Sequence, residues 1–96
     1  MSKKFLDLQD LILIKTSLEK VKMHVNERED KSIFKWIKRE SAVTISKCYK
    51  FPELKEPAEE MKKAIEGEDY EKLKEILPDL LNKVETKISE YYNSMQ

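Results

Sequence analysis

Glycine is almost absent from this chain, with Gly67 as its only copy in 96 residues. Loops that cradle phosphate groups with their backbone N–H groups need several glycines, so nucleotide-binding motifs of that kind are excluded. Only three prolines accompany that glycine, which leaves few positions for sharp turns. We therefore expect long elements joined by few loops.

Histidine and cysteine also occur once each, as His24 and Cys48. A catalytic nucleophile needs a base beside it, and no nucleophile motif flanks either residue. His24 and Glu27 lie one helical turn apart, but bundle metal sites use more carboxylates and usually two histidines. We expect no enzymatic activity, no catalytic residue, no bound metal and no cofactor.

A lone cysteine cannot form an internal disulfide, which is typical of the reducing cytoplasm, and we expect its thiol to be buried and inert. No stretch approaches the roughly 18 apolar residues of a membrane span, and the N-terminal segment lacks the cleavage site of a signal peptide. The sequence predicts a cytoplasmic protein whose residues 1–96 form one domain.

Apolar residues recur every three or four positions along most of the chain, which indicates amphipathic helices. The predicted helices cover residues 2–25, 32–48, at least 57–66, and 70 to beyond 91. The predicted inward stripes are Phe5, Leu8, Leu11, Ile12, Leu18, Val21 and Val25; Phe34, Ile37, Ser41, Ile45 and Cys48; Leu54, Ala58, Met61 and Ile65; and Tyr70, Leu73, Leu77, Leu80, Val84, Ile88 and Tyr91. Leu13 and Ile14 widen the first stripe, so we expect that helix to be covered on more than one side.

Capping residues and prolines mark the ends of these helices. Asp30 or Ser32 can cap the second helix and Asp69 the fourth, while Gly67 is placed to end the third in the left-handed conformation. Pro78 falls inside the last pattern, where a proline removes a hydrogen bond. The fold class predicted is all-α: a small antiparallel up-down bundle of about four helices, the last one kinked or broken near Pro78.

Charge is distributed unevenly although the chain is neutral overall. Residues 31–50 hold six lysines and arginines against Glu40 alone, a net of +5, whereas residues 51–80 carry a net of −5. The basic block also contains the only tryptophan, Trp36. We interpret this block as a partner-binding surface made by Lys35, Trp36, Lys38 and Arg39, with an apolar anchor and a basic rim that selects an acidic protein.

Two other uses of the basic block stay open. Opposed blocks of +5 and −5 also allow self-association into a homodimer, in which the basic helix of one copy meets the acidic segment of another. Lysine and arginine neutralise phosphates as well, so nucleic-acid binding is the alternative function. The missing small residue near Arg39, where a helix-turn-helix would bend, disfavours it.

Residues 54–91 resemble the last two helices of histidine phosphotransfer domains, which also form a hairpin around a Gly-Asp type of turn, here Gly67-Glu68-Asp69. The defining helix of that family carries a histidine followed by lysine and glycine. The second helix here has no histidine, and about Glu40 stands at that place. The resemblance implies a bundle of similar shape, with no phosphorylated residue, that binds partners.

Overall fold

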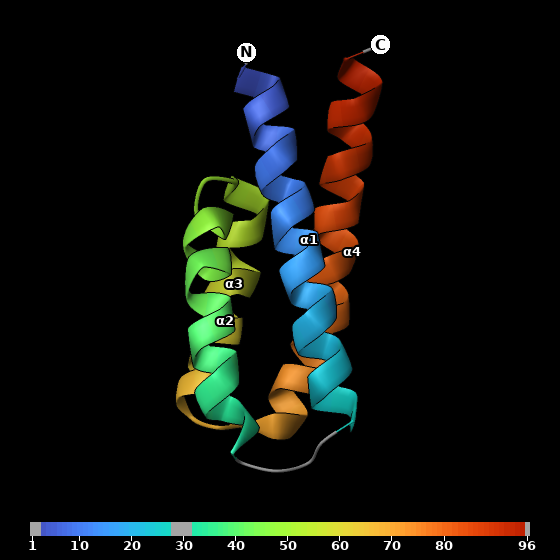
Figure 1. The fold of residues 1–96 in the computed structure, drawn as a ribbon. Coiled ribbons are helices and arrows are strands. Elements are labelled where there is room, and N and C mark those ends of the chain that lie inside the picture. Colours follow the sequence, from blue (N-terminus) through green and yellow to red (C-terminus); the bar gives the residue numbers. More distant parts are fainter. Residues whose placement is uncertain (1–2, 28–31, 96) are drawn as a thin grey trace.

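The computed structural model describes residues 3–27 and 32–95, and within them the chain forms four helices. They are α1 (Lys3–Glu27), α2 (Ile33–Cys48), α3 (Pro52–Glu66) and α4 (Tyr70–Ser94). Neighbours in the chain run antiparallel, and α1 packs against α2 and α4 while α3 packs against the same two helices (Figure 1). The predicted up-down bundle is confirmed.

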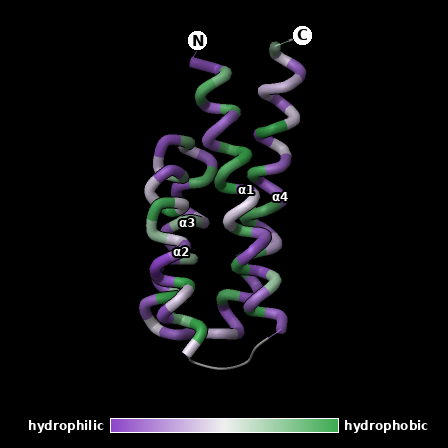
Figure 2. The backbone as a smooth tube through the Cα atoms, viewed as in Figure 1, coloured by the Kyte–Doolittle hydropathy of each residue, from purple (hydrophilic) through white to green (hydrophobic). Residues whose placement is uncertain are grey.

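The bundle is an elongated rod of 44 × 20 × 19 Å. The helices α1 and α4 extend beyond the turn that joins α2 to α3, and both chain ends lie at that end of the rod (Figure 1). Apolar residues recur along all four helices (Figure 2), and the buried ones form one core cluster. This core lies where the four helices overlap, and α1 and α4 continue beyond it (Figure 1).

The predicted inward stripes of α2, α3 and α4 are confirmed, since each member is buried or packs against the core. Val43, Thr44 and Ile45 are helical despite their β-branched side chains, because Thr44 and Ile45 are buried against neighbouring helices. The stripe of α1 was predicted partly wrongly. Phe5 and Ile12 are 38% and 43% exposed. Of the two residues expected to widen the stripe, Ile14 is fully buried but Leu13 is 56% exposed, so α1 is not covered on that further side.

Two prolines lie inside helices. Residue Phe51 is extended, as a residue before proline prefers, so α3 begins at Pro52 and passes through Pro57, five residues earlier than the minimum predicted. The last helix runs unbroken from Tyr70 to Ser94 through Pro78. The sequence predicted either a kink or a break near Pro78, and the structure excludes the break. Packing of both flanks of α4 against the core outweighs the missing hydrogen bond.

The turn between α3 and α4 differs from the prediction by one residue. Gly67 is helical, at φ −84°, and Glu68 takes the left-handed conformation, at φ 51°. The amide of Glu68 donates to Ile65 O and that of Asp69 to Ala64 O, which is the Schellman pattern. The Asp69 carboxylate then accepts from the Lys72 amide at 3.1 Å and caps α4 as predicted. Of the predicted caps of α2, Ser32 makes no side-chain cap and Asp30 lies outside the described residues.

Moving the glycine of this turn from position 67 to position 68 should stabilise the protein. The substitution Glu68→Gly removes the left-handed strain of a residue with a Cβ, and Gly67→Ala places a Cβ at an ordinary 3.4 Å from Lys63 O. Together they should raise the free energy of unfolding by about 1–2 kcal/mol. Urea denaturation would measure this, and an unchanged midpoint for Glu68→Gly would contradict the assignment of the turn.

Candidate functional site

The outward surface of α2 carries most of the residues predicted to bind a partner. Lys35, Lys38 and Arg39 are exposed, while the opposite face of the helix, around Phe34 and Ile37, is buried. None of these three cations forms an ion pair with another described residue. Their charge is therefore available to a second molecule.

Trp36 lies on the α1 side of α2 and is half-buried. Its ring meets the imidazole of His24 edge to face, with the ring centroids 4.5 Å apart. At 100° of rotation per residue, Arg39 points about 60° from Trp36, but Lys38 points about 160° from it. The four predicted residues thus spread round the exposed side of one helix: Trp36 lies towards α1, Lys38 towards α3, and Lys35 and Arg39 point outward between them.

A groove lies along the α3 flank of α2 and has a volume of about 320 Å³. Its floor is largely apolar, with Ala42 and Ile45 from α2 and Ile65 from α3, and Tyr49 stands at one end. Two lysines, Lys38 and Lys62, line it from opposite helices, together with the following groups: Ser41, Ser46 and Glu66.

Sequence reasoning missed this groove because its two walls come from different helices. Ala42 and Ser46 give the local signal, since small residues one turn apart on an exposed helix face leave room beside them. Val43 is 63% exposed, the highest value among the large apolar residues described. It points about 20° from Trp36 and about 100° from Ala42, so it belongs to the Trp36 side of α2 and not to the groove.

The acidic block lies elsewhere on the molecule. Glu53, Glu56 and Glu60 of α3 line a polar hollow with Glu75 and Asp79 of α4. No ion pair in the described parts of the chain joins this block to the basic block. Within these parts of the chain, the two blocks are therefore not paired with each other.

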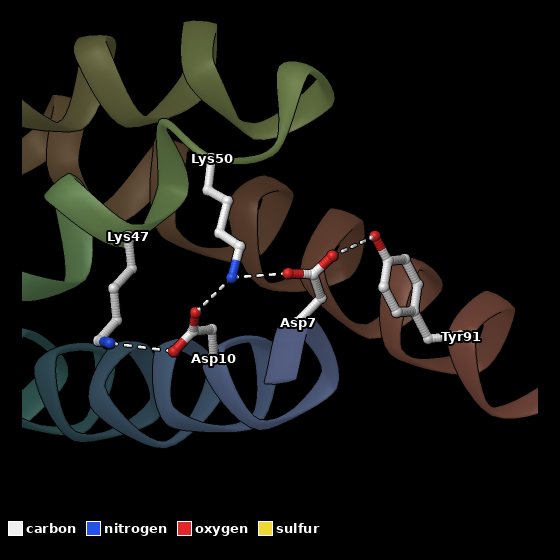
Figure 3. A network of polar contacts seen from close by, with 5 residues as sticks. All are labelled: Asp7, Asp10, Lys47, Lys50 and Tyr91. Carbon is white, nitrogen blue, oxygen red and sulfur yellow. Dashed lines mark hydrogen bonds and ion pairs between the residues drawn. The ribbon is translucent and has the colours of Figure 1, made fainter. Parts of the chain in front are cut away.

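Two other cations of the basic block form ion pairs with carboxylates of α1 (Figure 3). Lys50 Nζ lies 2.6 Å from Asp7 Oδ1 and 2.8 Å from Asp10 Oδ2, and Lys47 Nζ lies 3.0 Å from Asp10 Oδ1. The hydroxyl of Tyr91 donates to Asp7 Oδ2 at 3.4 Å, which brings α4 into the same network. These contacts tie the turn after α2 to both extended helices.

The charges of this network follow from their partners. Hydrogen bonds from Lys50 and then Lys47 lower the pKa of Asp10 below its ordinary value, and the bonds to Asp10 and Asp7 raise the pKa of Lys50. Burial, and then the charge of Asp7, raise the pKa of the Tyr91 hydroxyl. These shifts leave Asp10 ionised, Lys50 charged and Tyr91 neutral at neutral pH, and the ion pairs of Lys47 and Lys50 with α1 neutralise this part of the basic block within the molecule.

The single cysteine is closed to solvent, and the single histidine packs on Trp36 beside α2. Cys48 is fully buried, as predicted, and burial raises the pKa of its thiol to about 12. His24 is engaged with Trp36, and no group of three or more histidine, cysteine, aspartate or glutamate residues within 3–27 and 32–95 is arranged to hold a metal ion. Among the same residues, no helix is both long and apolar enough to cross a bilayer.

Comparisons with protein-family models, with curated proteins and with solved structures found no match to this chain. Glu40, at the place of the phosphorylated histidine in the family that residues 54–91 resemble, is half-buried with its carboxylate 4.0 Å from Lys20 Nζ. The surface of α2 and the groove beside it therefore have to be interpreted from their own geometry.

Proposed function

We propose that this protein is a non-enzymatic interaction module that binds an acidic, amphipathic helix of another protein along α2. The observation that carries the proposal is the combination at one place of an apolar groove and cations that lack an internal partner. Lys38 and Lys62 flank the groove, and Lys35 and Arg39 continue the positive charge over α2. Apolar side chains of the partner would enter between Ala42 and Ile65, and its carboxylates would meet the lysines.

Trp36 and Arg39 have a supporting part in this proposal. The tryptophan is fixed by its contact with His24, so its ring presents an ordered edge rather than a mobile anchor. Arg39 points outward beside it, about 60° round the helix, and offers a planar group that can bind a carboxylate through two hydrogen bonds. The partner would therefore contact the predicted surface of Lys35, Trp36, Lys38 and Arg39, while its apolar anchor sits in the groove.

A peptide of the stated chemistry tests this directly. The probe is an 18-residue amphipathic helix with leucine on one face and glutamate on the other, and its control carries lysine in place of glutamate. At low salt we expect the acidic probe to bind and the basic one not to bind, because cations surround the groove. The double variant Lys38→Glu/Lys62→Glu should weaken binding on the order of tenfold or more.

Calorimetry would measure these affinities, with Lys22→Glu as the matched variant because Lys22 is exposed on α1, away from the groove. That control should bind like the unchanged protein. Equal weakening by Lys22→Glu would show that only net charge matters and would contradict the site. A random DNA duplex that binds more tightly than the acidic probe, and loses affinity steeply with salt, would favour the nucleic-acid alternative instead.

A further inference from the structure

The outward face of α1 is the second unusual surface of the molecule. Between residues 5 and 16 every exposed residue of α1 is uncharged; these residues are Phe5, Leu6, Gln9, Ile12, Leu13 and Thr16. In α3, by contrast, every exposed residue except Pro52 is charged. Because 40% of the chain is charged, an uncharged outer face about three turns long indicates a surface that is covered.

The apolar residues of this face form two rows. Phe5 and Ile12 make one row on the α4 side, Leu6 and Leu13 make the other on the α2 side, and Gln9 and Thr16 lie between them. Of the charged residues within the same stretch, Asp7 and Asp10 turn towards the α2 segment and bind Lys50 and Lys47, while the half-buried Lys15 lies at the edge of the face, about 60° round the helix from Ile12. Thr16 turns its hydroxyl to Ile12 O at 3.0 Å, which leaves its methyl group outward.

We infer that this face of α1 binds the same face of a second copy of the chain, in an antiparallel pair about a twofold axis near Gln9. That arrangement sets Phe5 against Leu13 and Leu6 against Ile12 of the other copy, so both rows are covered at once. The Gln9 side chain has both a donor and an acceptor, and two copies at the axis can pair reciprocally. A parallel pair would instead set Lys3 and Lys4 beside their own copies.

The choice of a second copy follows from charge. A face without charged residues has nothing to select an acidic or a basic partner, whereas it matches itself when the helix is reversed. The exposed Tyr92 of α4 and Met95 just after it belong to the C-terminal end of α4, which lies at the same end of the rod as the first turns of α1 (Figure 1). This contact is separate from the groove between α2 and α3, so both surfaces can be occupied together.

The mass of the protein in solution tests the inference. Light scattering across a concentration series up to about 1 mM should show a mass approaching twice 11.4 kDa. The variant Leu13→Glu introduces a charge at a residue that is 56% exposed, and it should remain at 11.4 kDa with unchanged helical circular dichroism. The matched variant Val43→Glu, on the exposed face of α2, should dimerise like the unchanged protein.

Cross-linking tests the orientation. The native Cys48 is buried, so a cysteine introduced at Gln9 is the only accessible thiol among the described residues. Mild oxidation should link Gln9→Cys into a covalent dimer and leave Lys3→Cys monomeric. A chain that stays monomeric at every concentration overturns the inference and assigns the face to another occupant. A Leu13→Glu dimer, or efficient linkage through Lys3→Cys, overturns it as well.

Discussion

Replacing Phe34 with alanine should lower the free energy of unfolding by about 3–5 kcal/mol. Phe34 is 1% exposed and extends from α2 across the bundle, where its ring meets that of Tyr70 on α4 edge to face at 5.5 Å. The two helices are otherwise diagonal neighbours in the ring of four. Truncation therefore removes a large buried side chain and also the aromatic contact between the two halves of the bundle.

Chemical denaturation followed by circular dichroism would measure the loss, with Val43→Ala as the control on the same helix. Val43 is exposed, so its truncation should change the free energy of unfolding by no more than about 0.5 kcal/mol. Similar small effects for both variants would mean that α2 does not pack with its Phe34 side inward. The outward direction of Lys35, Lys38 and Arg39 would then be wrong too, because it depends on that orientation.

Replacing Pro78 with alanine should have the opposite effect on stability and raise the free energy of unfolding by about 1–3 kcal/mol. Pro78 lies in the middle of α4, and its ring is exposed. Alanine restores the amide that can donate to Lys74 O and removes the clash of the ring with the preceding turn, while little buried surface is lost.

Pro57→Ala is the informative comparison for this effect. Pro57 also lies inside a helix, but its ring is buried, so the regained hydrogen bond is offset by lost packing. We expect Pro57→Ala to give clearly less stabilisation than Pro78→Ala in the same denaturation experiment. A Pro78→Ala variant that is less stable than the unchanged protein would indicate that the proline shapes α4 in a way the core requires.

Periodicity alone was sufficient for the fold. The spacing of Leu73, Leu77, Leu80 and Val84 allows only one side of α4 to face the core, and that side is buried in the structure. In α1 apolar residues occur on all sides, so periodicity could not say which of Ile12, Leu13 and Ile14 is inside. The neighbouring helices decide it by covering Ile14, which is why Phe5 and Ile12 were placed wrongly.

Contacts between distant residues were beyond sequence reasoning. Tyr91 and Asp7 are 84 positions apart and meet only because α1 and α4 are antiparallel neighbours. The groove similarly needs Ala42 of α2 and Ile65 of α3 to face each other across a particular packing angle. The charge pattern did single out Lys35, Lys38 and Arg39 as exposed cations. An excess of lysine and arginine on one helix can be recognised from the sequence without knowing how the helices pack.

The most direct test of the proposed function is a map of the backbone amide signals of the labelled protein as the acidic amphipathic peptide is added. We expect the signals that shift to belong to the groove, centred on Ala42, Ile45, Tyr49 and Ile65, and to Lys38 beside it. Shifts confined to the acidic hollow around Glu56 and Asp79, or no shifts at millimolar peptide and low salt, would contradict the binding site proposed on α2.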